Sequence, residues 1–322
     1  MLTQEIKNKL NKLIGASQKP KVILGLSGGP DSIFLFHILK ELADENVIEL
    51  IAAHLNHDWR EEAKQDEVFC KNLCKQYNVP LIAKHADDLK INLKFNGSKE
   101  EIGRKLRRYF FEEVLKEHNA QFIALAHHLQ DQQETFFWRI IRGCTLSGLT
   151  CMREKDGVYI RPLLNINKEN LLKYLKENNL DFVEDESNTS DAFLRNRIRK
   201  YVLPSFKKCD ERFDKKFQDT LFHLQKEESF LKTLIEKTFE SVFEKKKNLV
   251  GDLKKFLALD SVLQHRVIVY WFCKEKVNFN LSHSFILEIT RFLSSPRGGV
   301  HELNQNWNIK KKNQFFWIEK SA

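Results

Sequence analysis

Short apolar runs alternate with longer amphipathic segments over the first part of the chain. The apolar runs occupy residues 22–26, 50–55, 80–85 and 122–128, and the amphipathic segments after them occupy 31–43, 61–77, 99–118 and 131–142. Short apolar runs bounded by turn residues are typical of buried strands, whereas the longer segments carry apolar residues at helical spacing. The pattern therefore predicts four β-α units that form a parallel sheet covered by helices on both faces.

The pattern changes after Pro204. Residues 212–246 and 252–275 carry Phe and Leu at helical spacing, and strand-like pieces return only near the C-terminus. A chain of 322 residues has room for one large domain or two. We therefore expect a Rossmann-like α/β domain with a parallel sheet over residues 1–205 and a mainly helical domain over 206–322.

The composition is that of an ordinary soluble globular protein, with 42% hydrophobic and 30% charged residues. No apolar run reaches the roughly 18 to 20 residues that span a bilayer, and residues 1–12 lack the apolar core of a secretory signal. We therefore expect a cytoplasmic protein without a membrane partner. The six cysteines include no Cys-x-x-Cys pair, so reduced thiols are expected.

The formal net charge is +9, and most of the surplus lies in residues 206–322. A basic region favours a polyanionic partner such as nucleic acid, because neutralising phosphates releases counterions. A lysine-rich helical surface that contacts only solvent explains the same surplus. Charge alone leaves both interpretations open.

Candidate chemistry begins at the first strand-to-helix turn, Ser27-Gly28-Gly29-Pro30-Asp31-Ser32. Glycine allows positive φ and lets the backbone approach a ligand closely, and proline suits the first turn of a helix, where its missing N–H costs nothing. The result is a nest of N–H groups and hydroxyls that suits phosphate. The turn has neither the Gly-Lys-Ser/Thr of a Walker loop nor the Gly-x-Gly-x-x-Gly of a dinucleotide turn. A tight turn capped by Ser and Asp is the alternative.

Histidines follow two of the predicted strands. His54 and His57 flank Asn56 at the end of the second apolar run, and His127 and His128 end the fourth. Ligands of open parallel sheets bind beyond the carboxyl ends of the strands, so we expect these side chains to face the same cleft as the loop. A zinc site is the alternative, but neither segment has a third ligand at suitable spacing.

Acidic side chains stand at the start of the helix predicted over 131–142. Asp131 and Glu134 are related as i and i+3, so they lie on one face of the first helical turn. From the residues alone, their simplest role is to complement the positive end of the helix dipole.

Arginines form two further groups of interest. Arg104 lies on a predicted helix, and Arg195, Arg197 and Arg199 follow an acidic turn. A guanidinium pairs well with phosphate or carboxylate. Surface charge without a ligand explains such clusters equally well.

The string Ser-Gly-Gly-x-Asp-Ser resembles the loop of the PP-loop ATP pyrophosphatase superfamily, whose members cleave ATP between the α- and β-phosphates and transfer AMP to an acceptor oxygen. Within that superfamily, the chain is similar to the tRNA(Ile)-lysidine synthetase family. The other matching pieces are HLNHDWR (54–60), EIGR (101–104), AHHLQDQQET (126–135), RPLL (161–164), EDESN (184–188) and RNRIR (195–199). They follow the family's order from about residue 22 to residue 204. Trp59 and Gln130 depart from the residues that the family usually carries there.

The resemblance implies an ATP-dependent ligase that uses ATP and Mg²⁺. The residues that it assigns to ATP are Ser27, Gly28, Gly29, Pro30, Asp31, Ser32, His54, Asn56, His57 and His127, and Asp31 also holds the metal. The catalytic residues that it implies are Asp31, Asp131, Glu134, Arg104, Arg195 and Arg197. Of the catalytic residues, Asp131 and Glu134 are implied to bind the lysine amine or magnesium. Glu184 and Asp185, outside both sets, are implied to order the arginines.

The substrates implied by the resemblance are an isoleucine tRNA with a CAU anticodon and free L-lysine. The wobble cytidine at position 34 is adenylated, and lysine then replaces AMP to give lysidine, with pyrophosphate as the other product. The basic helices after residue 212 are expected to bind the tRNA. The sequence leaves the oligomeric state open, a homodimer included.

Two other functions compete with this expectation. A tRNA thiolation enzyme has the same loop, but such relatives commonly use cysteine pairs, and the sequence has no Cys-x-x-Cys. A non-catalytic RNA-binding module is the second, against which Asp31, Asp131 and Glu134 argue, because a pure binder needs no carboxylates beside a bound polyphosphate.

Overall fold

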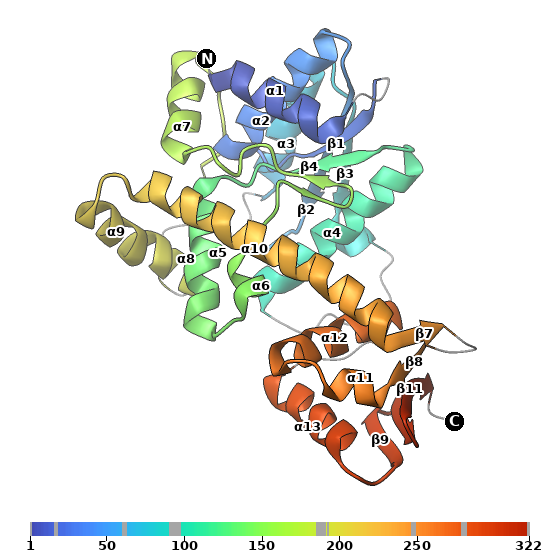
Figure 1. The fold of residues 1–322 in the computed structure, drawn as a ribbon. Coiled ribbons are helices and arrows are strands. Elements are labelled where there is room, and N and C mark those ends of the chain that lie inside the picture. Colours follow the sequence, from blue (N-terminus) through green and yellow to red (C-terminus); the bar gives the residue numbers. More distant parts are fainter. Residues whose placement is uncertain are drawn as a thin grey trace. The chain divides into compact units, whose positions relative to one another are not determined.

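The computed structural model describes residues 2–15, 19–59, 63–89, 98–184, 191, 193–245, 249–277 and 282–320. The chain divides into two units, Met1–Phe222 and His223–Ala322, and the division falls within one helix (Figure 1). Each unit is described separately below. No helix among the described residues is both long enough and apolar enough to cross a membrane.

The first unit contains a six-stranded sheet in the order β3-β2-β1-β4-β6-β5. Its strands are β1 (Lys21–Gly25), β2 (Glu49–Asn56), β3 (Leu81–His85), β4 (Phe122–Ala124), β5 (Lys155–Asp156) and β6 (Tyr159–Ile160). All neighbours pair in parallel except the short edge strand β5. The four predicted strands are therefore present, and they form the expected parallel sheet.

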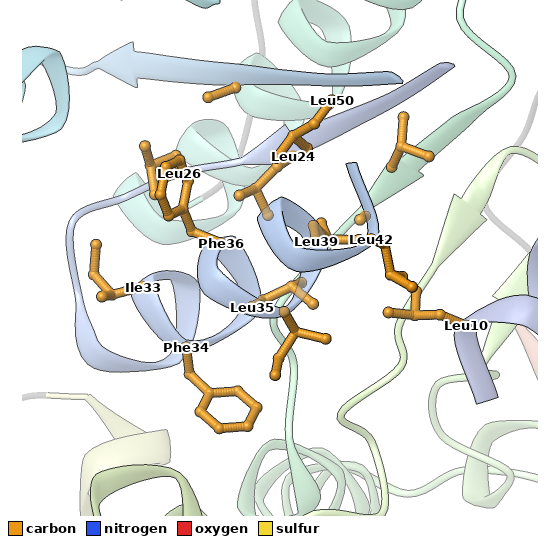
Figure 2. Close-up of a cluster of buried hydrophobic side chains, with 14 of the residues drawn as sticks. Leu10, Leu24, Leu26, Ile33, Phe34, Leu35, Phe36, Leu39, Leu42 and Leu50 are labelled. Carbon is orange, nitrogen blue, oxygen red and sulfur yellow. The ribbon is translucent and has the colours of Figure 1, made fainter. Parts of the chain in front are cut away.

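The helices of this unit cover both faces of the sheet. They are α1 (Leu2–Ile14), α2 (Pro30–Asp44), α3 (Ala63–Gln76), α4 (Lys99–Glu117), α5 (Leu129–Arg142), α6 (Leu146–Leu149), α7 (Lys168–Glu177), α8 (Leu194–Arg197) and α9 (Leu203–Cys209), with the short turns η1 (Ala86–Asp88) and η3 (Ile198–Val202) and the first part of α10 (Phe213–Val242). Buried Val22 and Leu24 pack with α1, α2, α3 and α7 on one face, where Figure 2 shows the side chains of α2. Ile23 points to the other face and packs with Phe110 and Val114 of α4.

The placement of α4 follows from the direction in which the chain crosses the sheet. From β1 the chain moves outward to β2 and β3, and it then returns to the far side of β1 to form β4. Because crossovers between parallel strands are right-handed, this reversal puts α4 on the face opposite α2 and α3. The strand order reverses between β1 and β4, and a crevice for ligands is expected at their carboxyl ends.

The second unit combines helices with an antiparallel sheet. After α10 come β7 (Phe243–Lys245), β8 (Leu249–Asp252), α11 (Leu253–Leu257), α12 (Ser261–Lys274), α13 (His283–Ser294), β9 (Gly299–Asn304), β10 (Trp307–Lys312) and β11 (Phe315–Lys320). The five strands pair in the order β7-β8-β11-β10-β9. Trp271, Phe256 and Phe316 are fully buried where helices and sheet meet.

The prediction of a mainly helical domain over 206–322 therefore needs correction. The long helices are present, but β7 lies inside the segment 212–246 that was predicted to be helical throughout. The antiparallel sheet that contains β7 depends on the pairing of β8 with β11, and these two strands are far apart in the sequence. Local apolar periodicity does not report such pairing, because strand stability comes mainly from neighbours across the sheet.

Candidate active site

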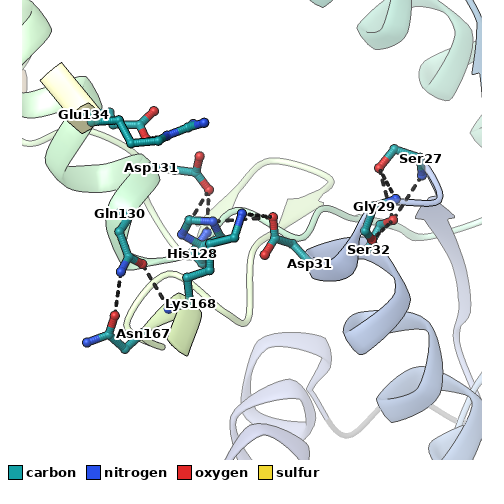
Figure 3. Close-up of polar contacts among 11 residues, drawn as sticks. Ser27, Gly29, Asp31, Ser32, His128, Gln130, Asp131, Glu134, Asn167 and Lys168 are labelled. Atoms are coloured by element: carbon teal, nitrogen blue, oxygen red, sulfur yellow. Dashed lines mark hydrogen bonds and ion pairs between the residues drawn. The ribbon is translucent and has the colours of Figure 1, made fainter. Parts of the chain in front are cut away.

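The turn after β1 is closed by its own hydroxyl groups. Ser32 donates from Oγ to the carbonyl of Gly29 over 2.9 Å, and the backbone N–H of Ser27 donates to Oγ of Ser32 over 3.2 Å. The two serine hydroxyls lie 3.1 Å apart (Figure 3). Gly29 is the N-cap of α2 and Pro30 opens the helix. The first N–H groups of a helix have no partner within it, so the turn presents donors at the positive helix end, as expected for an anion site.

Gly28 makes the turn possible. Its φ of +87° lies in the left-handed region that side chains with a Cβ adopt at a cost. Its carbonyl accepts a hydrogen bond of 2.9 Å from the N–H of Val183, which ties the turn to the segment before residue 185. A Cβ added at Gly28 would lie 3.4 Å from Val183 Cγ2.

One carboxylate oxygen of Asp31 faces both the His128 ring and the Lys168 ammonium. Nε2 of His128 and Nζ of Lys168 each lie 3.5 Å from its Oδ2 (Figure 3). Burial raises the pKa of Asp31, but the hydrogen bond and charge of His128, followed by Lys168, outweigh burial, so its pKa lies below the ordinary value. The other oxygen, Oδ1, is buried without a hydrogen-bond partner in the described part of the chain.

Lys168 was not among the predicted site residues. It is the first residue of α7, and its backbone N–H donates over 3.0 Å to Oε1 of Gln130, whose amide donates in turn to Asn167 over 2.6 Å. Gln130, one of the departures from the family pattern, therefore fixes the start of α7 against α5. An isolated lysine carries no signal in the sequence that separates it from the many others.

The two predicted acids on α5 have different surroundings. Oδ2 of Asp131 accepts a hydrogen bond of 2.8 Å from the backbone N–H of His128 and thus caps the helix. Glu134 is 2% exposed and accepts a hydrogen bond of 2.6 Å from Nε of Arg199. Burial raises the pKa of Glu134 although Arg199 opposes it. Asp131, whose side chain is 27% exposed, is therefore the acid with free surface toward a ligand.

His54 and Asn56 hold the strand ends in place. Nδ1 of His54 lies 2.9 Å from the carbonyl of Leu26, directly before the Ser27–Ser32 turn. The amide of Asn56 donates to the carbonyl of Ala63 over 3.3 Å and to Glu67 over 3.0 Å. Through these contacts, His54 ties the end of β2 to the end of β1, and Asn56 ties it to the start of α3.

The remaining predicted residues differ in how far their surroundings are defined. His57 stacks on Trp59, with ring centroids 4.5 Å apart. His127 is within electrostatic reach of Asp131 and of Arg104. Arg195 acts electrostatically on Glu134. Arg197 and Glu184 are exposed, and Asp185 lies outside the described residues.

The base of α5 is tied to α10 through one carboxylate. Gln133 is fully buried, and its amide donates to Oδ1 of Asp214 over 2.8 Å. Asn167 donates to the other oxygen over 2.6 Å, and Lys207 lies 3.1 Å from it. Asp214, itself on α10, therefore joins α5, the start of α7 and α9.

Metal ligands are sparse in this arrangement. No group of three or more His, Cys, Asp or Glu side chains in the described ranges is placed to hold an ion. Oδ1 of Asp31 is the one buried carboxylate oxygen at the turn that lacks a hydrogen bond there. Magnesium commonly takes one or two carboxylates and completes its shell with phosphates and water, so a single free oxygen fits that ion when a nucleotide is also bound.

Comparison with known proteins identifies the family. A family model described as the PP-loop domain matches residues 2–206. A tRNA(Ile)-lysidine synthase from Petrotoga mobilis is 32% identical, and the alignment covers 99% of this chain and 100% of that protein. This chain belongs to the tRNA(Ile)-lysidine synthase family. The sequence match to that family is thereby confirmed across both units.

Other members of the lysidine synthase family are longer. The enzyme of Pseudothermotoga lettingae is 34% identical and covers 94% of this chain, but the alignment includes 66% of its own length. For an enzyme from Clostridium perfringens the identity is 35%, with 91% of this chain and 65% of that protein covered. The chain thus spans just under two thirds of these two relatives and the whole of the Petrotoga protein.

A solved structure shares the fold with this lysidine synthase family member. The U34-tRNA thiolase NcsA from Methanococcus maripaludis, solved with its [4Fe-4S] cluster, superposes with a TM-score of 0.55 and covers 68% of this chain and 80% of its own. The sequence identity is 21%, so the likeness concerns the fold.

Proposed function

We propose that this protein forms lysidine on an isoleucine tRNA with a CAU anticodon, using ATP and free L-lysine. The observation that carries the proposal is the position of the His128 ring between the Ser27–Ser32 turn and α5, with its nitrogens 3.5 Å from a carboxylate oxygen of Asp31 and of Asp131, in a chain of the lysidine synthase family. A phosphate-binding turn and an accessible acid at one edge suit a reaction with a nucleotide and an amine.

In the first step, O2 of the wobble cytidine attacks the α-phosphate of ATP, and the bond to the β-phosphate breaks to release pyrophosphate. The turn and the N-terminus of α2 would hold the phosphates, since phosphoryl transfer depends mainly on positioning and on neutralising charge. Lys168 lies beside Asp31 and would bring positive charge to the same place. His128 lies there too, and although burial opposes it, Asp131 and Asp31 raise the pKa of its ring. A bound Mg²⁺, held in part by Asp31 Oδ1, would supply further neutralisation.

In the second step, the lysine amine attacks C2 of the cytosine ring, and AMP leaves with the electrons of the C2–O2 bond. The attacking amine must be neutral, so a proton has to leave it. Asp131 is the better placed acceptor, because Glu134 is enclosed and already bonded to Arg199. Arg195 and Arg199, next to Glu134, would then orient the acids or contact the RNA.

The catalytic part is proposed to lie in residues 1–205 and the tRNA-binding part in residues 206–322. The second part is basic, and Lys245 is exposed at the end of β7. The lysines that follow it, Lys246 and Lys247, are proposed for the same role and lie outside the described residues. A thiolation reaction is disfavoured because the sequence lacks a Cys-x-x-Cys pair, although the fold is shared with a thiolase.

The proposal is tested by pyrophosphate release and by mass analysis of the tRNA nucleosides. An isoleucine tRNA transcript with a CAU anticodon should trigger pyrophosphate release, and adding lysine should convert one cytidine to lysidine. Asp31→Ala should abolish release, whereas Asp44→Ala, at the exposed end of the same helix, should leave it intact. A normal rate with Asp31→Ala, or RNA binding without any ATP consumption, would point to a binding module instead.

A further inference from the structure

Four buried nitrogen atoms lack a hydrogen-bond partner at one corner of the sheet edge, as far as the described residues extend. They are Nδ1 and Nε2 of His57, Nδ1 of His127 and Nε of Arg161. Buried polar groups in native proteins are nearly always hydrogen-bonded, so each unmatched group calls for an explanation. Four of them in one region indicate a partner that the protein itself does not provide.

The sheet explains why these three side chains share a region. His57 follows β2, His127 follows β4 and Arg161 follows β6, and the three strands run parallel within the order β2-β1-β4-β6. Ala124 is paired with Ile160, and the N–H of Leu125 still bonds the carbonyl of Ile160. The residues after these strands therefore leave the sheet at the same edge.

Helix α4 forms the wall on the side of His57. A Cβ added at Gly103 would lie 3.6 Å from His57 Cε1 and 2.6 Å from the indole of Trp59, so only glycine permits this approach. Nε of Arg107 reaches back to the carbonyl of Gly103 over 3.4 Å. Arg107 thereby stands next to the stacked rings.

The charge of this corner comes from arginines. Arg107 acts on both histidines, and Arg104 acts on His127 and on Arg161. Burial, assisted by these arginines, lowers the pKa of His57 and of His127 to about 4, so both imidazoles are neutral near pH 7. Each neutral ring offers one N–H donor.

Arg161 is the innermost member, at 8% exposure. Its NH1 donates to the carbonyl of Arg153 over 3.1 Å, and its guanidinium stands over the ring of Tyr159, yet no carboxylate pairs with it in the described ranges. Asp156 affects it only through its charge at longer range. A buried guanidinium without an anion is unfavourable, because buried charges are normally paired.

We propose that His57 and His127, which the family resemblance assigns to ATP, instead bind a phosphate group together with Arg161 at this corner, as a site separate from the Ser27–Ser32 turn. Phosphate oxygens accept the N–H groups that are left over and neutralise the guanidinium. Only the source of this phosphate rests on the proposed function. Under that function, the phosphate is either a phosphodiester of the RNA strand near the reacting cytidine, or the departing pyrophosphate. A metal ion fits poorly, because the neighbouring arginines repel it.

The first experiment compares Arg161→Met with Arg108→Met by titration calorimetry. Arg108 stands over the same Tyr159 ring but is exposed and paired with Glu112, so it matches Arg161 in type and neighbour. Inorganic pyrophosphate and an anticodon stem-loop RNA serve as ligands. Arg161→Met should weaken one of them by about tenfold or more, whereas Arg108→Met should change neither by more than about twofold. The ligand that is weakened identifies the source, and unchanged binding of both overturns the site.

The second experiment uses the unaltered protein, so it does not depend on a variant folding. Nitrogen NMR of the histidine rings is recorded while pyrophosphate, and separately the stem-loop RNA, is added. The ring signals of His57 and His127 should shift with one of the two ligands, and no shift with either contradicts the proposal. Lysidine formation is measured independently, so its absence together with a shift would refute the proposed function and leave this site standing.

Discussion

Nζ of Lys168 lies 3.5 Å from Oδ2 of Asp31, and this contact joins the start of α7 to the start of α2. The backbone of Lys168 is fixed at the start of α7, because its N–H donates to the side chain of Gln130. A nucleotide at the turn would bring phosphate charge within its reach.

Lys168→Met should therefore raise the KM for ATP about tenfold, since one charge-assisted contact to phosphate is lost. Lys173→Met, a change on the exposed face of the same helix, is the matched control and should leave KM unaltered. The measurement is pyrophosphate release at varied ATP. Equal KM values for the two variants would show that Lys168 does not bind the nucleotide.

Gly28→Ala should slow pyrophosphate release by about tenfold to a hundredfold, because φ at this position is +87° and the turn must shift to relieve the strain. Gly157→Ala is a suitable control: φ there is +58° and a Cβ meets no atom within 4 Å. Both variants should lose a similar amount of stability in thermal unfolding. If Gly157→Ala slowed the reaction as much, general destabilisation would explain the effect.

Arg199→Met should lower the free energy of unfolding by about 1 to 3 kcal/mol, since it leaves the buried Glu134 carboxylate without its partner and Arg199 is itself partly exposed. The pKa of Glu134 is already raised by burial, so the folded state binds more protons than the unfolded state above about pH 4.3. Stability from this group is present at low pH and declines as pH rises through its folded pKa. Removing Arg199 should raise that pKa further.

The pH dependence of Arg199→Met is measured by urea unfolding from about pH 4 to pH 8. The stability gap to the unaltered protein should widen with rising pH and nearly close at the acid end. Arg212→Met, which removes an exposed pairing with Asp210, should give a small and nearly constant gap. A gap for Arg199→Met that is independent of pH would show that lost packing, not the carboxylate, is responsible.

Lys245→Glu should weaken tRNA binding and reduce the slope of log affinity against log salt by about one. Lys116→Glu is the control. Lys116 lies in the last turn of α4, which leads into the start of β4 at the edge opposite the cleft. Filter binding at several salt concentrations provides the slopes. Identical slopes for both variants would move the tRNA contact away from β7.

The parallel sheet and the turn at 27–32 could be predicted because both depend on local patterns. Apolar runs mark buried strands, and glycines with proline mark a turn into a helix. Lys168 could not be found this way, because its meeting with Asp31 depends on how α7 packs against α2. Nor does the position of Glu134 in the sequence indicate that its carboxylate is hydrogen-bonded to Arg199, which is 65 residues away.

The second unit shows the complementary limit. The helical spacing of α10 and α12 was read correctly, yet the sheet that completes their core was missed in part, since β8 and β11 form it from separate ends of the unit. The burial of Arg161 could not be predicted either. The motif RPLL contains this arginine, but its guanidinium is buried only because the strands fold into a sheet.

The carboxylate of Asp214 also decides where a working catalytic fragment can end. The match to the PP-loop domain stops at residue 206, before the partner of the fully buried Gln133 amide. Phe217 and Leu221, one and two helical turns further on, cover Leu129 at the start of α5. A protein cut at residue 206 would leave the amide groups of Gln133 and Asn167 without Asp214 as their hydrogen-bond acceptor and would remove Phe217 and Leu221 from Leu129. The smallest piece that folds around the acids of α5 should therefore extend through residue 222.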